Sequence, residues 1–308
     1  MHRSWRFGRG CAVVAALALA LPLAACSDDE DDATPAASSS ATSETGQELT
    51  VFAASSLTET FTDLGHKFEA AHSGVTVTFN FGSSATLATQ INEGAPADVF
   101  AAASPTTMKT VTDAGNGEGT PVTFVRNKLE IAVPSGNPGK VEGLDDFAKD
   151  DLDIALCDVS VPCGAAAEKA FTAAGVTPKP DTRETDVKAT LTKVQLGEVD
   201  AALVYQTDVE AANKANPNQV EGINFPEADQ AINEYQIVAL KDSDSSDLAA
   251  DWVDYVSSPE AQDVLTAAGF QPGTGADSSA GATPSAEPTD ASSDSSSEAA
   301  ESPSPTSS

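Results

Sequence analysis

The chain has 308 residues and is strongly acidic: 47 aspartates and glutamates against 16 lysines and arginines give a formal net charge of −31 at pH 7. This balance argues against nucleic acid and anionic membrane surfaces as partners, because both would repel the chain. The length is sufficient to bury a sizeable core, as one large domain or as two lobes.

The first 25 residues have the pattern of a secretory signal peptide. Arginines come first, and the apolar stretch Cys11–Ala25 that follows is too short for a comfortable membrane span. It ends in Leu23-Ala24-Ala25-Cys26, which resembles the lipobox of bacterial lipoproteins. The resemblance implies cleavage before Cys26 and a lipid on its sulfur, which would anchor the protein to the outer face of the cell membrane. The alternative is a soluble secreted protein.

Two stretches outside the core have the composition of disordered chain. Residues 26–48 and 272–308 consist mainly of Ser, Thr, Ala, Pro and acids, without apolar periodicity. We expect an acidic linker before the core and a flexible acidic tail after it. The signal peptide and these flanks carry three of the bases and thirteen of the acids, so the core, residues 49–271, keeps a net charge of −21.

The core opens with a stretch that combines a strand, a serine turn and a helix. Leu49–Ala53 is an apolar, partly β-branched run that is typical of a buried strand. Ser56 follows, and we expect it to be the N-cap of the next helix. The apolar spacing after it predicts one helix face, at Leu57, Phe61, Leu64 and Phe68. Unpaired N–H groups and the helix dipole favour anions at such a turn, although an ordinary capped helix without a ligand has the same pattern.

Strands and helices alternate through the rest of the core. Further apolar runs predict strands at residues 75–81, 98–103, 122–125, 129–133, 154–157, 201–205 and 235–240. Helical segments lie between them, so the sequence predicts an α/β fold with parallel strands.

Three further turns of the opening kind follow along the chain. Phe81–Leu87, which contains Ser84, Val161–Gly164 and Glu184–Val187 each lead into a predicted helix. In open α/β sheets such helix N-termini gather at the carboxyl ends of the strands, where ligands bind. None of these turns contains Lys or Arg. The predicted ligand is therefore an anion held by neutral donors.

Two cysteines, Cys157 and Cys163, remain in the core. An exported chain meets an oxidising environment, so we expect them to form a disulfide that clamps the loop between them. A metal pair or a catalytic thiol are the alternatives. Of the three histidines, His2 lies in the signal peptide, and His66 and His72 lie on or beside the first predicted helix. None is near a cysteine, which weakens both alternatives.

The core resembles the molybdate-binding proteins that serve bacterial ABC importers, within the two-lobed type II periplasmic binding protein fold. The stretches that carry the resemblance span nearly all of the core, in the family's order: Val51–Thr58 (VFAASSLT), Gly82–Gln90 (GSSATLATQ), Gly94–Phe100 (GAPADVF), Val161–Ala165 (VPCGA), Asp186–Val187 and Leu203–Asp208 (LVYQTD).

The resemblance implies five oxyanion ligands. Ser56 and Ser84 would provide hydroxyl and backbone N–H groups, Cys163 and Val187 backbone N–H groups, and Tyr205 its phenol O–H. The third position is commonly Ala in the family, so Cys163 departs from the pattern. Because only its N–H is used, the change should be tolerated.

The resemblance also implies the architecture and the partners. Residues 49–128 and 226–271 would form one lobe and residues 129–225 the other, with a hinge near 129–133 and 223–235 and the anion in the cleft between the lobes. The ligand would be molybdate or tungstate, without a cofactor or a directly bound metal. The protein would act as a monomer and deliver its anion to a membrane permease.

Other interpretations remain at this stage. The chain has no G-x-S-x-G elbow and no histidine near its serine turns, so it is not expected to be an enzyme. A structural or adhesion lipoprotein and a binder of another oxyanion, such as sulfate, are the alternatives. Ser84 could be a simple N-cap, Val187 a core residue, and Tyr205 a half-buried aromatic bonded to the backbone. We expect Asp98 to orient a turn, and Asp186 to cap its own helix and point away from the anion.

Overall fold

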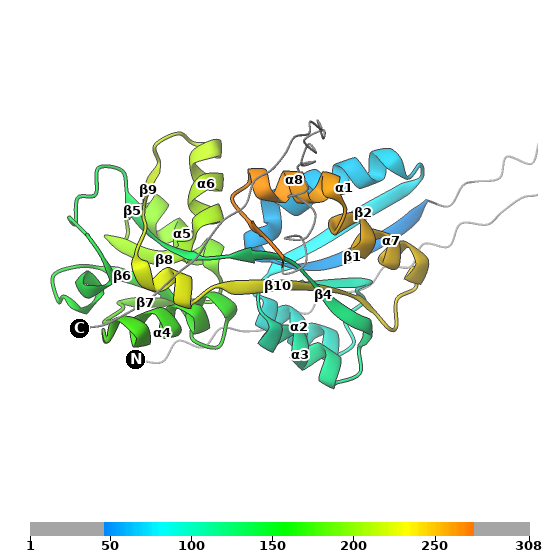
Figure 1. The fold of residues 1–308 in the computed structure, drawn as a ribbon, viewed down its shortest axis with the longest axis horizontal. Coiled ribbons are helices and arrows are strands. Elements are labelled where there is room, and N and C mark those ends of the chain that lie inside the picture. The colour runs from blue at the N-terminus through cyan, green and yellow to red at the C-terminus, as the bar shows by residue number, and fades with distance from the viewer. Residues whose placement is uncertain (1–45, 274–308) are drawn as a thin grey trace, which may run out of the picture. The chain divides into compact units, whose positions relative to one another are not determined.

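The computed structural model describes residues 46–273, which form two β-sheets covered by helices (Figure 1). The first sheet has the strand order β11-β4-β10-β3-β1-β2. Its strands are β1 (Gln47–Ala54), β2 (Val75–Gly82), β3 (Val99–Ala102), β4 (Gly117–Asn127), β10 (Asn233–Leu240) and β11 (Gln271–Pro272). We call this sheet and its helices lobe A: α1 (Thr58–Ala71), α2 (Ser84–Asn92), α3 (Pro105–Asp113), α7 (Ser246–Val256) and α8 (Pro259–Ala267).

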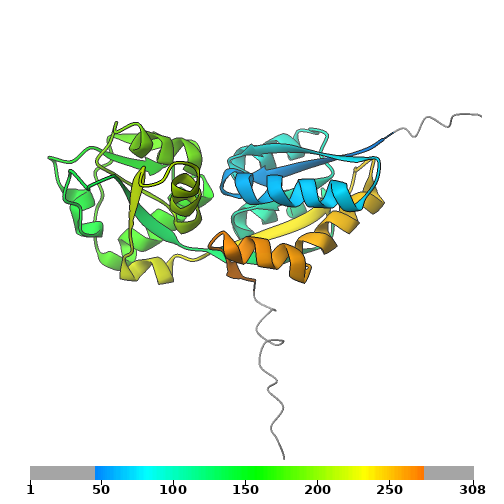
Figure 2. The same cartoon turned by 90° about the horizontal axis from the view of Figure 1, so that it is seen from above.

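The second sheet has the strand order β7-β6-β8-β5-β9. Its strands are β5 (Leu129–Pro134), β6 (Ile154–Cys157), β7 (Thr182–Glu184), β8 (Ala201–Tyr205) and β9 (Val220–Ile223). We call this sheet and its helices lobe B: α4 (Pro162–Ala174), α5 (Val187–Gln195) and α6 (Gln206–Ala215). Figure 2 shows lobe B in green, and lobe A in blue and cyan with the returning C-terminal part of the core in orange.

Lobe A buries both faces of its sheet because successive strand residues point to opposite sides. Val51 and Ala53 of β1 pack with Phe61 of α1 and Trp252 of α7 in one apolar cluster. Phe52, between them in sequence, packs in a second cluster with residues of α2 and α3. This explains why the strand is apolar without alternation, as strands covered on both faces are.

The strands were predicted to be parallel, but five of the nine pairings are antiparallel, and three of these five join strands that the sequence predicted. The parallel pairs are β1–β2, β1–β3, β6–β7 and β6–β8, whereas β10 runs antiparallel to β3 and β4, β11 to β4, and β5 to β8 and β9. A parallel neighbour needs a crossover, usually a helix. β4 instead continues into β5 through Lys128 alone, and β10 carries the chain back into lobe A.

The short edge strands escaped prediction. β7 and β9 lie at the two edges of the lobe B sheet and β11 at an edge of the lobe A sheet. They have only two to four residues and are largely not buried, so they lack the apolar signal on which the prediction depended. All the strands that were predicted are present, and β6 and β8 have the predicted bounds.

The paired strands begin two residues before the predicted core and end one residue after it, because Gln47 and Glu48 pair with β2 and Pro272 pairs with Val125 of β4. The predicted signal peptide 1–25, Cys26, the linker up to Thr45 and the tail from residue 274 lie outside the described residues. The predicted division into 49–128, 129–225 and 226–271 stays a prediction. None of the helices formed by residues 46–273 is long and apolar enough to cross a membrane.

Two buried asparagines lie where β4 and β10 pair, next to the points at which the chain passes from one lobe to the other. Asn127 and Asn233 are opposite each other in the strand register. The Asn127 amide donates to the hydroxyl of Thr207 in α6, 2.8 Å away. The Asn233 amide donates to the carbonyl of Ala103 in lobe A at 2.8 Å and to the phenol oxygen of Tyr205 in lobe B at 2.6 Å. Asparagine side chains of β4 and β10, the strands next to these two crossings of the chain, are thus hydrogen-bonded to both lobes.

Candidate functional site

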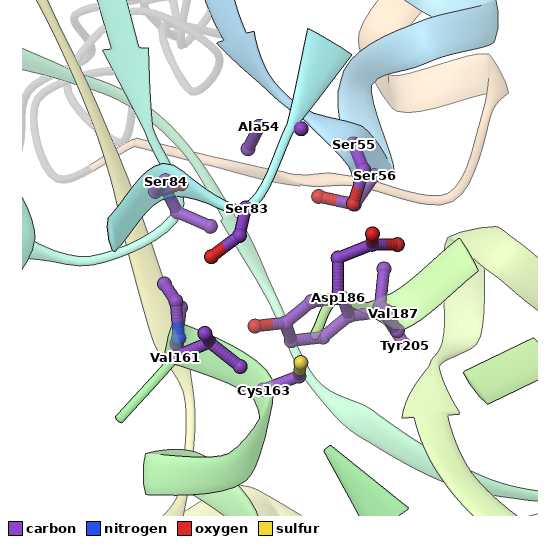
Figure 3. Close-up of a pocket in the computed structure, with 13 residues that line it drawn as sticks. Ala54, Ser55, Ser56, Ser83, Ser84, Val161, Cys163, Asp186, Val187 and Tyr205 are labelled. Atoms are coloured by element: carbon purple, nitrogen blue, oxygen red, sulfur yellow. The ribbon is translucent and has the colours of Figure 1, made fainter. Parts of the chain in front are cut away.

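A small pocket lies where the first turns of four helical segments from both lobes meet (Figure 3). It is lined by Ala54, Ser55, Ser56, Gly82, Ser83, Ser84 and Ala103 of lobe A, and by Val161, Pro162, Cys163, Asp186, Val187 and Tyr205 of lobe B. All five residues predicted as oxyanion ligands are in this set. The volume of the pocket that the centre of a water molecule can occupy is about 20 Å³. By the same measure, a single water needs roughly 10–15 Å³. The pocket therefore suits a ligand of a few heavy atoms and not a sugar or a peptide.

Ser56 is not the N-cap that its position predicted. Ser55–Leu57 form a short 3-10 turn, and α1 begins only at Thr58, with Leu57 as N-cap and no side-chain capping bond. The Ser56 hydroxyl instead lies 2.8 Å from the phenol oxygen of Tyr235 in β10. A partner 179 residues away in sequence replaces the local capping bond, so the hydroxyl is held at the pocket wall.

Ser84 is also not a simple N-cap. It is the first residue of α2, and the N-cap position belongs to Ser83. The buried Ser84 hydroxyl accepts the N–H of Ala103 at 3.0 Å. Because a hydroxyl has one hydrogen and two lone pairs, its own hydrogen remains available to a ligand.

Tyr205 ends β8 and is almost completely buried, with 1% of its surface exposed. Its phenol oxygen accepts the Asn233 amide and, within residues 46–273, bonds no backbone group, so the predicted alternative of a backbone-bonded, half-buried tyrosine was wrong. Burial, then the nearby Tyr235 and Asp208, raise the pKa of the Tyr205 phenol well above its ordinary value. The group therefore keeps its hydrogen and can only be a donor to an anion.

Cys163 and Val187 present backbone groups to the pocket from the first turns of α4 and α5. N–H groups in the first turn of a helix have no intrahelical acceptor. In α5 the Asp186 carboxylate accepts the N–H groups of Lys188 and Ala189, so Asp186 is the predicted N-cap. It leaves the Val187 N–H as an open donor of that turn. Asp186 also lines the pocket (Figure 3), so the prediction that it points away from the anion is not confirmed. Asp98 is not among the lining residues; its carboxylate accepts the Thr50 N–H of β1 at 2.7 Å and the Ser243 hydroxyl at 2.5 Å.

The predicted disulfide joins Cys157 to Cys163. It ties the end of β6 to the first turn of α4. The next residue must be glycine, because a Cβ at Gly164 would lie 1.9 Å from the carbonyl oxygen of Asp158. The disulfide and this close contact together set the position of the α4 N-terminus.

A cation near the pocket is engaged elsewhere. Lys188, in the first turn of α5, pairs through its ammonium group with Glu59 of α1 at 2.8 Å and with Asp208 of α6 at 3.1 Å. The pair with Glu59 bridges the two lobes. No lining residue is a Lys or Arg, so the pocket offers an anion only hydroxyl and amide donors. Sequence reasoning missed this bridge, and also the supporting roles of Asn233 and Tyr235, because each connects segments far apart in the chain.

Comparison with known proteins agrees with this geometry. Residues 49–271 match the model of a family described as bacterial extracellular solute-binding protein. The chain belongs to this family. The prediction that it is not an enzyme is thereby confirmed, since the family consists of transport components, and an extracytoplasmic location follows from the same membership.

Individual members of the family and solved structures with the same fold are similar to this chain. The chain is 36% identical over 236 residues to the molybdate-binding protein ModA of Mycobacterium tuberculosis, covering 77% of this chain and 89% of the relative. The periplasmic molybdate-binding protein of Azotobacter vinelandii shares the fold with a TM-score of 0.61 at 23% identity, covering 72% of this chain and 98% of that structure. The sulfate-binding protein SubI of M. tuberculosis shares it with a TM-score of 0.65 at 16% identity, covering 75% and 88%. The two-lobed α/β fold of this solute-binding protein is therefore the predicted one.

Proposed function

We propose that this solute-binding protein captures molybdate in the pocket between its lobes and delivers it to an ABC importer. The observation that carries the proposal is the donor set: hydroxyl and amide groups of Ser56, Ser84, Cys163, Val187 and Tyr205 line one small pocket without a cation. The relationship to ModA supports molybdate as the anion. Tungstate, which has nearly the same size and charge, should bind as well.

The donors are arranged to give hydrogens and not to accept them. Ser84 and Tyr205 each already accept a hydrogen bond from the protein, from Ala103 and Asn233. Their own hydrogens can therefore be given to an oxygen of the ligand, and a fully deprotonated oxyanion, which only accepts, matches such donors. A hydrogen bond to a charged partner contributes about 1.5–3 kcal/mol, and the roughly seven bonds that the five residues offer can exceed an association cost of about 4–15 kcal/mol.

Binding should favour the closed arrangement of the lobes. Ser56 and Ser84 belong to lobe A, and Cys163, Val187 and Tyr205 to lobe B, so only the closed form presents all donors to one anion. The importer's permease would recognise that form. A lipid on Cys26 would keep the monomeric protein at the outer face of the membrane, near the permease.

A sulfate-binding role is the second candidate, because SubI has the same fold. Calorimetry on the mature protein with molybdate, tungstate, sulfate and phosphate separates the two. We expect heat with molybdate and tungstate and much weaker binding of sulfate, whose smaller size leaves long contacts in a cavity fitted to molybdate. Binding of sulfate alone would establish the second candidate, and no binding of any oxyanion would contradict both.

Ser56→Ala should weaken molybdate binding by roughly 1–3 kcal/mol, because a donor to the anion is lost and the buried Tyr235 phenol loses its partner. Calorimetry checks the value. Ser73→Ala, at an exposed serine just after α1, is the control and should bind as the wild type does. An unchanged affinity of Ser56→Ala would remove Ser56 from the site.

Loss of the disulfide should lower stability. Replacing both Cys157 and Cys163 by Ala frees the loop between them in the unfolded chain, and a loop this short corresponds to about 2 kcal/mol of unfolding free energy. Urea denaturation of the variant, compared with wild type with and without reductant, measures the effect. Equal midpoints for oxidised and reduced wild type would contradict it.

A further inference from the structure

Ser83 occupies a position where serine normally caps a helix, but it does not cap. It is the N-cap residue of α2, and its carbonyl accepts the Leu87 N–H, the first bond of the helix. Its side chain makes no capping bond. An N-cap serine usually accepts an N–H of the following turn, as Ser104 does at the start of α3, where its hydroxyl accepts the Thr107 N–H at 3.2 Å. The Ser83 hydroxyl therefore does not satisfy any N–H group of its own helix.

Within residues 46–273, no group bonds this hydroxyl. Ser83 is only 7% exposed, and its oxygen is buried without a hydrogen-bond partner. Buried polar groups in folded proteins are nearly always paired, so an unpaired one requires an explanation. Among the serine hydroxyls that line the pocket, those of Ser56 and Ser84 are bonded to the protein. Ser83 differs from both.

The direction of the side chain indicates where the missing partner belongs. Ser83 lines the pocket together with the predicted ligands. In Figure 3 its hydroxyl points from the lobe A wall into the pocket, toward the side formed by Val161 and Tyr205 of lobe B. A ligand in the pocket would thus meet the Ser83 hydroxyl at the wall where Ser84 also starts its helix.

We propose that Ser83 is a sixth oxyanion-binding residue, whose hydroxyl donates a hydrogen bond to the bound tetrahedral anion. This inference rests on the proposed function and extends its site. Ser83 and Ser84 then act as a pair from one turn: Ser84 is held in place by the Ala103 N–H, and Ser83 is held only by the ligand. The unpaired hydroxyl in the protein without ligand becomes paired on binding, so this donor contributes to affinity and not to folding.

The test compares Ser83→Ala with Ser104→Ala in the mature protein. Calorimetry measures the dissociation constant for molybdate, and thermal denaturation without ligand measures stability. For Ser83→Ala we expect a dissociation constant raised about 10-fold or more, as loss of a bond to a charged partner predicts, and an unliganded melting temperature that is unchanged or higher. For Ser104→Ala we expect wild-type affinity and a lower melting temperature, because a capping bond is lost.

Wild-type affinity of Ser83→Ala would overturn the proposal. If its melting temperature also falls, as expected for Ser104→Ala, Ser83 has a structural role only. Ser83→Gly gives a second reading, since glycine is tolerated at N-caps, and should weaken binding equally. If the wild type binds no oxyanion, the proposed function fails and Ser83 with it. If the wild type binds molybdate and both Ser83 variants bind it as tightly as the wild type does, only the role of Ser83 fails.

Discussion

Replacing Lys188 by Met is expected to lower the unfolding free energy by about 3 kcal/mol at pH 7.5. Lys188, 25% exposed, is the ion-pair partner of Asp208, whose side chain is 0% exposed. Besides this ammonium group, Asp208 accepts the Tyr205 N–H at 3.2 Å. Removing one member of a buried pair leaves an uncompensated charge, at about 3–5 kcal/mol; the partial exposure of Lys188 places the expected value at the lower end.

The pH dependence of the Lys188→Met variant has a definite sign. Burial already raises the pKa of the Asp208 carboxyl, and Lys188 opposes that rise. Without Lys188 the pKa should rise further, so the folded variant holds a proton that the unfolded chain releases above its ordinary pKa of 3.8. The stability of the variant should therefore fall as the pH rises through the raised pKa, and the deficit should be smaller at pH 5 than at pH 7.5.

Two controls separate the buried charge from the bridge between the lobes. Glu59→Gln removes only the partner that is 52% exposed, so it should change stability by less than about 1 kcal/mol. Combining Lys188→Met with Asp208→Asn removes both buried charges and should recover much of the loss. Urea denaturation without ligand gives the unfolding free energies of the wild type, the two single variants and the double variant. A Lys188→Met variant as stable as Glu59→Gln would contradict the assignment.

Replacing Glu130 by Gln should stabilise the protein at pH 8 by about 3 kcal/mol and change little at pH 4.5. Glu130 lies in β5 and is 6% exposed. Its carboxyl packs against β9, where a Cβ on Gly222 would lie 2.4 Å from the carboxyl carbon. Burial, and then the charge of Glu210, raise the pKa of Glu130 from 4.5 to about 7, against a smaller opposing effect of Lys128. The Lys128 ammonium group itself lies 3.8 Å from Asp229.

The direction in which stability changes with pH follows from the raised pKa of Glu130. The folded protein keeps Glu130 protonated between pH 4.5 and 7, whereas the unfolded chain has released the proton. The stability contributed by protonated Glu130 is therefore lost as the pH rises through this window, and by pH 8 the buried carboxylate is charged. Glutamine has nearly the same shape and does not titrate. Urea denaturation at pH 4.5 and pH 8 measures the difference, with exposed Glu118→Gln in β4 as the control. An equal effect of Glu130→Gln at both pH values would contradict the raised pKa.

The serine turns show where local patterns stop being informative. The sequence correctly indicated that Ser56 and Ser84 stand at strand–helix junctions, but it predicted a capping role for Ser56. Capping depends on residues three positions apart, whereas Ser56 bonds Tyr235, and Ser84 bonds Ala103, 19 residues away. A local sequence pattern cannot show that neither of the two adjacent serines caps α2 through its side chain and that both line the pocket.

The sequence by itself determined the α/β alternation, the bounds of β6 and β8, the disulfide partners and the helix starts that meet at the pocket. These features depend on apolar periodicity, on local capping preferences and on how few cysteines the chain has. Only the tertiary structure decided the antiparallel course of β5 and β10, the Asn233–Tyr205 and Lys188–Glu59 contacts, the buried state of Glu130 and the unpaired hydroxyl of Ser83. Each of these depends on which distant segments become neighbours when the two sheets pack, and that information is spread over the whole chain.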